Sequence, residues 1–89
     1  MNLNVVAKIR ITPNGVDTDL DSIKASLEKV LEGTGKLHES EIKPIAFGLK
    51  SLDATLLLDD SKGGLEEIEA ELKQKTGVSQ VDVLDINRL

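Results

Sequence analysis

Acidic side chains gather at two places where they could bind a metal ion. The first group is Asp17, Asp19 and Asp21, and the second is Asp59-Asp60. Carboxylates are the ligands that Mg²⁺ and Ca²⁺ prefer, but such sites need more converging oxygens than these spacings guarantee. Each group also precedes an apolar stretch with helical periodicity, where acidic side chains stabilise the helix start. We therefore interpret both groups as helix starts and expect no bound metal or cofactor.

His38 is the only histidine of the chain, and cysteine is absent. Without cysteine there are no disulfides, thiolate metal sites or cysteine nucleophiles. His38 stands in a polar stretch, with no serine or aspartate at a spacing typical of a catalytic triad, so we interpret it as a solvated loop residue. Gly63-Gly64 precedes a predicted helix and could cradle an anion, but two glycines alone are a weak signal. The sequence therefore favours a binding protein over an enzyme.

Composition indicates one small domain that spans residues 1–89. The chain has 89 residues, of which 39% are hydrophobic and 30% charged, enough for one sheet-and-helix core. The formal net charge of -5 argues against broad nucleic-acid binding, which needs clustered Lys and Arg. No apolar run is long enough to span a membrane, and Asn2 begins a polar start that does not resemble a secretory signal. We expect an acidic cytoplasmic protein.

Apolar periodicity predicts a strand and then a helix at the beginning of the chain. Residues 3–12 alternate between apolar and largely polar side chains, as in a strand with one buried face. Turn-forming residues 12–15 end this strand. The helix that follows is expected to be capped by Asp17 or Thr18 and to end near Gly33. Its apolar stripe has helical spacing and consists of Leu20, Ile23, Leu27, Val30 and Leu31.

Two further strands are predicted in the middle of the chain. A polar connection through residues 38–41 leads into the first of them, and Pro44 within that strand places it at a sheet edge or a bulge. That strand contains Ile42, Ile45 and Phe47. The next strand, Ser51 to Asp59, alternates regularly between apolar and mostly polar side chains.

A second helix and a last strand complete the pattern. Asp60-Ser61 is expected to cap the helix, and Gly77 to end it. The buried stripe of this helix is Leu65, Ile68 and Leu72. In the last strand, Val78 to Ile86, the apolar alternation slips between Val83 and Leu84, which indicates a β-bulge.

The order strand-helix-strand-strand-helix-strand predicts an α+β, ferredoxin-like sandwich. Helices with one apolar stripe must cover one face of a common sheet, and right-handed crossovers leave one compact arrangement. We expect a four-stranded antiparallel sheet in the order 4-1-3-2, with both helices on one face. This fold hosts many functions, so the function must be inferred from sites.

Two functions of such sheets can be weighed on the sequence. Sheet-face RNA binding needs exposed aromatic side chains on the central strands. The outward positions there are Lys8, Arg10, Asp53 and Thr55, none of which is aromatic. We therefore expect no direct nucleic-acid binding. A small-molecule-binding regulatory module stays open as an alternative, although no residue indicates a particular ligand.

Phe47 is the only aromatic residue, and it lies beside the predicted turn at residues 47–51. From composition alone such a ring fills a core, because large aromatic side chains gain free energy from burial. The same general expectation makes Arg88 a solvated residue in a loose chain end. A ring beside a turn can instead be offered to a partner, and the periodicity does not decide between these roles.

The run PIAFGLKSLDATLLLDDSKGGLEEI resembles the catalytic domain of the translation elongation factor 1-beta family. The resemblance extends without gaps from Ile42 to about Ile68. Its most specific part is Pro44, Phe47-Gly48-Leu49-Lys50 and Leu52, followed at the right distance by Asp59-Asp60 and Lys62. The length matches the archaeal type. The resemblance implies a guanine-nucleotide exchange factor without bond chemistry of its own. Its partner would be the GDP-bound form of the GTPase elongation factor 1-alpha, and its action would regenerate the GTP form for aminoacyl-tRNA delivery.

Two site residues follow from this resemblance. The aromatic residue of the Phe-Gly turn, here Phe47, is expected to press into the partner near its switch region. The family's penultimate Lys falls on Arg88, which would reach toward the Mg²⁺ site of the partner. Because a guanidinium prefers bidentate acidic partners, Arg88 either takes the place of the metal or binds an acidic Mg²⁺ ligand or a phosphate. Lys50 and Asn87 join the expected partner-binding set only as sequence neighbours.

Overall fold

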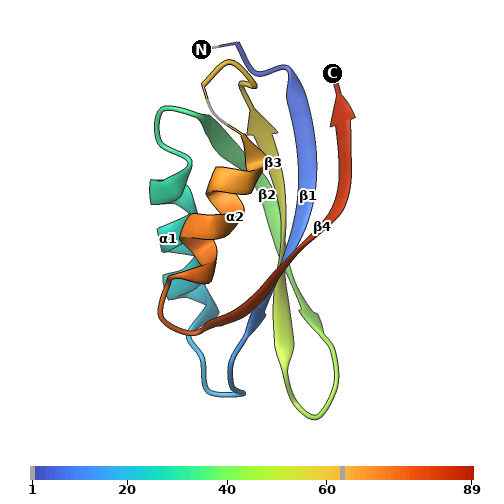
Figure 1. The fold of residues 1–89 in the computed structure, drawn as a ribbon. Helices are drawn as coiled ribbons and strands as arrows, with labels where there is room; N and C mark the ends of the chain where they lie inside the picture. The colour runs from blue at the N-terminus through green and yellow to red at the C-terminus, as the bar shows by residue number, and fades with distance from the viewer. Residues whose placement is uncertain (1, 63) are drawn as a thin grey trace.

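The computed structural model describes residues 2–62 and 64–89 of the chain. Four strands and two helices follow one another in the predicted order (Figure 1). Their bounds are β1 Val5–Pro13, α1 Leu20–Val30, β2 Gly35–Pro44, β3 Lys50–Leu58, α2 Leu65–Lys73 and β4 Val78–Arg88. Neither helix is long and apolar enough to cross a membrane, within the part of the chain that the structure describes.

The four strands form one antiparallel sheet in the order β2-β3-β1-β4. Both helices lie on the same face of this sheet, and the opposite face is open (Figure 1). The predicted ferredoxin-like βαββαβ sandwich and its strand order are therefore confirmed. Pro44 is the last residue of β2, which is an edge strand. The N–H that proline lacks therefore costs the sheet no hydrogen bond.

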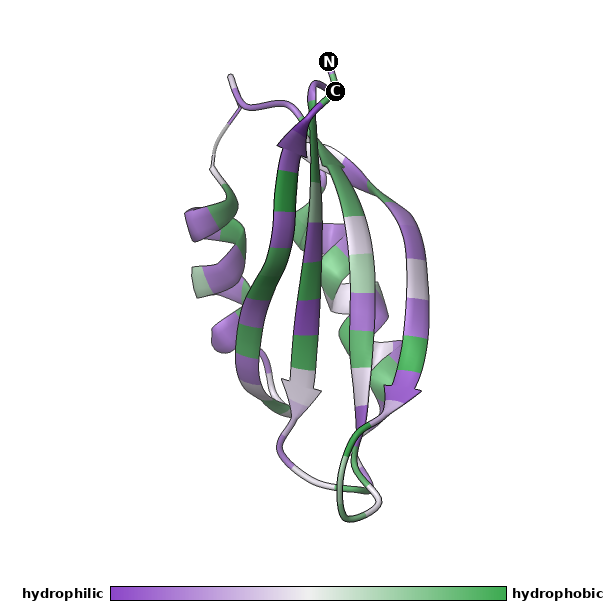
Figure 2. Ribbon diagram, turned by 90° about the vertical axis from the view of Figure 1, so that its right-hand side faces the viewer, coloured by the Kyte–Doolittle hydropathy of each residue, from purple (hydrophilic) through white to green (hydrophobic). Residues whose placement is uncertain are grey.

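The hydrophobic core lies between the sheet and the helices. On β1, every second residue faces the helices, so Ala7, Ile9 and Ile11 are fully buried. Figure 2 shows the resulting alternation of hydrophilic and hydrophobic residues along the strands. The helices contribute Leu27 and Leu72, both also fully buried. Burial of one such leucine contributes roughly 1.5–3 kcal/mol.

The position of β2 differs from the prediction. This strand begins at Gly35 and ends at Pro44, so His38 lies in an edge strand rather than in a loop, and Phe47 lies beyond the strand. A register shift between Leu37 and Glu39 in the pairing with β3 interrupts the apolar alternation at His38. The strand is polar because it forms a sheet edge and most of its residues are exposed. The prediction that His38 is solvated is confirmed, since the residue is exposed.

Both predicted helix caps were wrong. Asp19, rather than Asp17 or Thr18, caps α1: its carboxylate accepts hydrogen bonds from the backbone N–H groups of Asp21 and Ser22. The residue preceding α2 is Gly64, which has no side chain to form a cap. The expected cap Asp60-Ser61 lies in the loop before it, where Asp59 accepts hydrogen bonds from Ser61.

The predicted bulge in β4 is confirmed. Lys8 of β1 pairs with Asp85 and Ile9 pairs with Val83, so Leu84 is the extra residue. The bulge shifts the alternation of β4 by one residue, and Ile86 then faces the same side as Val83. Both side chains are partly exposed, at 54% and 39%.

Candidate partner-binding site

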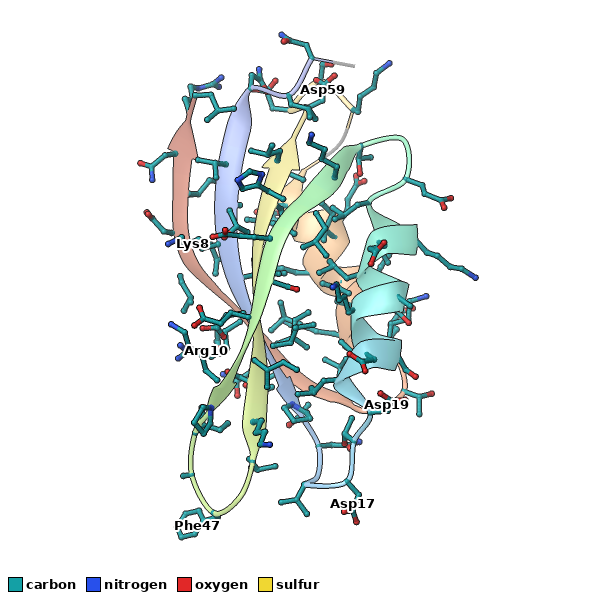
Figure 3. The ribbon with its side chains drawn as sticks, turned by 180° about the vertical axis from the view of Figure 1, so that it is seen from behind. Lys8, Arg10, Asp17, Asp19, Phe47 and Asp59 are labelled. Atoms are coloured by element: carbon teal, nitrogen blue, oxygen red, sulfur yellow. The ribbon has the colours of Figure 1, made fainter. Side chains whose placement is uncertain are left out.

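Phe47 lies at the tip of the β2–β3 hairpin and points away from the rest of the molecule (Figure 3). Its exposed fraction is 98%. The interpretation from composition alone, a core phenylalanine, was therefore wrong. A fully exposed ring gains nothing from the hydrophobic effect in the free protein, so its position needs a local explanation.

The local explanation is a tight turn. The N–H of Leu49 donates to the carbonyl of Ala46 at 3.0 Å, which makes Phe47 and Gly48 the two central residues. Their φ angles are 54° and 81°, and positive φ at both central residues is what a type I′ hairpin turn requires. A side chain with a Cβ is disfavoured there by roughly 1–2 kcal/mol. The turn directs the Phe47 ring into solvent at a cost in local strain.

Other exposed apolar side chains lie at the same end of the molecule. Val16, in the loop after β1, is 62% exposed, while Ile42 and Ile45 of the hairpin are 49% and 42% exposed. A Cβ placed on Gly48 would lie 3.6 Å from the Val16 side chain, so the loop and the hairpin are in close contact. We call Val16, Ile42, Ile45 and Phe47 the hairpin-end patch. Lys50 is exposed beside it.

A shallow groove of about 380 Å³ lies between the β1–α1 loop and the hairpin. Its lining includes Val16, Ile42, Gly48 and Lys50. Sequence spacing does not group Val16 with Phe47, because the two residues belong to different loops. The strand pairing Ile42↔Leu52, with Leu52 next to Ile11, brings these loops to one end of the sheet.

The other predicted residues lie at the opposite end of the sheet. Arg88 is the last residue of β4 and pairs with Val5, while Asn87 pairs with Val6. The Nη1 atom of Arg88 lies 3.1 Å from Oδ2 of Asp60, and the N–H of Leu89 donates to the carbonyl of Asn4 at 3.0 Å. The general expectation of a loose chain end was therefore wrong, although the Arg88 side chain is 75% exposed.

The structure thus brings Phe47 together with Lys50, and Asn87 with Arg88, but it separates the two pairs. The beginning of β1 and the end of β4 lie at the end of the sheet away from the hairpin (Figure 1). The longest dimension of the molecule is 39 Å. A partner that contacts Phe47 and Arg88 at once must extend along this long axis.

Between the two ends, the open face of the sheet carries a charged cluster. The guanidinium of Arg10 donates two hydrogen bonds to Asp53, from Nε to Oδ1 and from Nη2 to Oδ2, each at 3.0 Å. The hydrogen bond from Arg10 holds the pKa of Asp53 below its usual value, and Asp53 in turn raises the pKa of Arg10. Lys43 lies 3.8 Å from the same carboxylate.

This cluster lines a groove of about 360 Å³ together with acidic residues of β2. Because the basic groups there face carboxylates, the groove has no excess of positive charge for a phosphate. The exposed aromatic ring of Phe47 lies at the hairpin tip, away from Arg10 and Lys8 (Figure 3). The open face therefore lacks the aromatic platform on which RNA bases stack.

The two acidic groups serve local structure. Asp19 caps α1, and hydrogen bonds from Ser22 lower its pKa. Asp59 is 3% exposed and accepts from Ser61 and from the N–H of Asn2, contacts that lower its pKa. Among residues 2–62 and 64–89, no group of three or more acidic or histidine side chains is placed to hold a metal ion. The Gly63-Gly64 anion cradle falls partly outside the described residues, because Gly63 is not among them.

Solved structures with similar folds share little sequence with this chain. The ACT domain from the GTP pyrophosphokinase of Chlorobium tepidum matches with a TM-score of 0.61 at 17% identity, covering 91% of this chain and 99% of that domain. The C-terminal domain of the MgtC protein from Mycobacterium tuberculosis matches with a TM-score of 0.64 at 20% identity, covering 97% and 87%. At these identities the likeness supports the fold alone.

Sequence relatives are far more informative. Residues 6–89 match the family model of the EF-1 guanine nucleotide exchange domain. The chain is 44% identical to elongation factor 1-beta of Methanococcoides burtonii, covering 94% of each protein. It is 40% identical to that of Methanothermobacter thermautotrophicus, covering 97% of each, and 36% identical to that of Halorubrum lacusprofundi, covering 97% and 98%. The chain therefore belongs to the elongation factor 1-beta family, and its activity is nucleotide exchange rather than covalent catalysis.

Proposed function

We propose that this protein binds the GDP-bound form of elongation factor 1-alpha and promotes exchange of GDP for GTP. This would regenerate the GTP form that delivers aminoacyl-tRNA, and it would take place in the cytoplasm. The observation that carries the proposal is Phe47, a 98% exposed ring on a strained turn. Strained backbone and exposed aromatic rings are both features that recur at functional contacts.

The hairpin-end patch supplies the first contact. Phe47 enters an apolar pocket of the GTPase, and Val16, Ile42 and Ile45 exclude water around it. Truncation of an aromatic residue at the centre of an interface typically costs about 2 kcal/mol or more. The turn presents the ring without rearrangement of the hairpin, which lowers the entropy cost of binding. Lys50 adds a cation at the edge of this contact.

Arg88 supplies the second contact, at the nucleotide site. Its guanidinium binds an acidic Mg²⁺ ligand or a phosphate, or takes the place of the metal, and Asn87 lies next to it on β4. Mg²⁺ helps to hold the nucleotide phosphates, so a competing cation weakens GDP binding. The antiparallel sheet links Arg88 to the hairpin end, so docking through Phe47 also delivers Arg88.

Exchange then follows from coupling between two ligands of the GTPase. If this protein lowers the affinity of the GTPase for GDP by some factor, GDP must lower the affinity for this protein by the same factor. No covalent bond is made or broken, and the factor is released unchanged when GTP binds.

Release of labelled GDP from elongation factor 1-alpha tests this proposal. Catalytic amounts of the protein should accelerate release, and an unchanged release rate would refute the proposal. Phe47→Ala should raise the concentration needed for half-maximal rate by about tenfold or more. Its circular dichroism spectrum and melting temperature should stay unchanged, because the ring makes no core contact.

The alternative is a small-molecule-binding regulatory module. The likeness to the ACT domain extends to the fold and not to the residues, so it does not favour this alternative. A metabolite that shifts the melting temperature, together with no effect on the GTPase, would favour this alternative.

A further inference from the structure

The end of β4 is held by side chains from two other parts of the chain. Asp60, in the loop after β3, forms the ion pair with Arg88 at 3.1 Å. Asn4, just before β1, fixes the carboxylate from its other side: its Nδ2 donates to Oδ1 of Asp60 at 3.0 Å. The N–H of Asp60 donates in return to Oδ1 of Asn4 at 3.2 Å. We call Asn4, Asp60 and Arg88 the terminal clamp.

The backbone of Asn4 joins the same elements. Its N–H donates to the carbonyl of Leu58 at the end of β3, at 2.9 Å, and its carbonyl accepts from Leu89 at 3.0 Å. Asn4 therefore ties the last residue of the chain to β3, while its side chain orients Asp60. The carboxylate that faces Arg88 is thus anchored to the sheet by reciprocal hydrogen bonds with Asn4.

The ion pair leaves most of the guanidinium free. The contact with Asp60 uses Nη1, and the Arg88 side chain is 75% exposed. A guanidinium carries five N–H donors in a rigid fork, so Asp60 can hold one edge while another edge binds a carboxylate or phosphate. An ion pair this exposed adds little to global stability. Its main effect is on the direction in which Arg88 points.

We propose that Asp60, held by Asn4, is a positioning residue that orients Arg88 for the nucleotide site of the GTPase. The inference rests on the proposed function, in which Arg88 acts at that site. A long arginine side chain loses much rotamer freedom when it is fixed in a complex, and prior orientation removes part of this cost. The clamp therefore acts on the step after docking, when Arg88 engages the phosphates or the metal ligands.

The test compares Asp60→Asn with the unchanged protein in GDP release from elongation factor 1-alpha. Asparagine keeps the shape and an acceptor for Asn4 but lacks the charge that holds Arg88. The maximal release rate should fall about two- to fivefold, the effect expected from freeing one rotamer-rich side chain. The concentration for half-maximal rate and the melting temperature should change little, because docking depends on the distant Phe47 end.

A matched control is Glu66→Gln, which removes the same charge from an exposed position in the first turn of α2 and leaves the clamp intact. The control should match the unchanged protein. In an Arg88→Gln background, Asp60→Asn should have no further effect, because the group that it positions is gone. If the two changes instead reduce the rate independently, Asp60 does not act through Arg88.

The outcomes separate this inference from the proposed function. If the unchanged protein fails to accelerate GDP release, the proposed function fails. If it does accelerate release, and Asp60→Asn gives an equal or higher maximal rate, the proposed function stands and the positioning role is overturned. A higher rate would mean that Asp60 restrains Arg88 in the free protein.

Discussion

Phe47 and Gly48 share the two central positions of one turn, and both have positive φ, 54° and 81°. For Gly48 this conformation is free of steric cost, whereas for Phe47 it is disfavoured by roughly 1–2 kcal/mol. The Phe47 side chain is also 98% exposed, so the residue that strains this turn gains no burial in the free protein. This combination supports the proposed binding role of Phe47, because the free protein gains no stability from the exposed ring.

Replacement of Phe47 by asparagine should separate the effect of this residue on partner binding from its effect on stability. Phe47→Asn gives the turn an Asn-Gly sequence, the pair that type I′ hairpins favour most. We expect the free energy of unfolding to rise by about 1 kcal/mol, or about 4–8 °C in melting temperature for a domain of this size. Exchange activity should fall as far as in Phe47→Ala, since both changes remove the ring. Thermal unfolding and GDP release on the same samples provide the measurements.

Phe47→Ala is the matched control for the turn. Alanine still carries a Cβ into the left-handed region, so its melting temperature should stay close to that of the unchanged protein. If Phe47→Asn melts no higher than Phe47→Ala, the turn does not store the proposed strain. If both variants keep full exchange activity, Phe47 is not the contact residue.

A substitution in the core should lower stability and leave exchange activity unchanged, the opposite of what we expect for Phe47→Ala. Leu27 is fully buried on α1, and Leu27→Ala leaves a cavity against the sheet. We expect a loss of about 2–5 kcal/mol in the free energy of unfolding, measured by urea denaturation. At a temperature where this variant is still folded, its exchange activity should stay unchanged. A drop in activity as large as that of Phe47→Ala would show that exchange responds to stability in general.

The core of this fold could be predicted because the apolar residues of its strands and of its helices each recur at a clear spacing in the sequence. Strand alternation marked Ile9 and Ile11, and helical spacing marked Leu27, and all three are fully buried. The bulge at Leu84 was also visible, because an extra residue shifts the alternation of a strand. The sequence-based prediction put β2 too far along the chain. An exposed edge strand needs few apolar residues, and a register shift at His38 hides its alternation.

The candidate site depended on features that periodicity does not contain. Phe47 is exposed because it occupies the first central position of the hairpin turn, with a positive φ angle that an apolar pattern does not predict. The contact of Arg88 with Asp60 joins two distant parts of the chain, and it follows from the strand order and not from local pattern. The sequence signal that did find these residues was the resemblance to a family.

Acid sensitivity should depend in part on Asp53. Its pKa is held below the ordinary value near 3.8, first of all by the hydrogen bond from Arg10. The native state thus binds this proton more weakly than the unfolded state does. The stabilisation is fully present above the unfolded value and is lost as the pH falls through the lowered native value. Asp53→Asn should therefore be less stable than the unchanged protein at neutral pH.

Urea unfolding at a series of pH values measures this difference. The gap between Asp53→Asn and the unchanged protein should be constant from neutral pH to about pH 5, well above the ordinary aspartate pKa, and should narrow below pH 4. A gap that stays constant to the lowest pH at which the protein folds would contradict the assignment. Asp85→Asn, an exposed acid of β4 without this arginine pair, is the control.

The chemical role of Arg88 can be tested by two substitutions that differ in charge. Arg88→Gln keeps much of the side-chain length but removes the cation, and a lost charge-assisted contact costs about 1.5 kcal/mol or more, so the maximal rate of GDP release should fall about tenfold or more. Arg88→Lys keeps the charge, and its maximal rate should stay within about threefold of the unchanged protein, a difference below about 0.7 kcal/mol. Neither change should lower the melting temperature, because the side chain is 75% exposed. If Arg88→Lys is as slow as Arg88→Gln, the bidentate fork is required, and the contact is with a carboxylate or phosphate and not at the metal position.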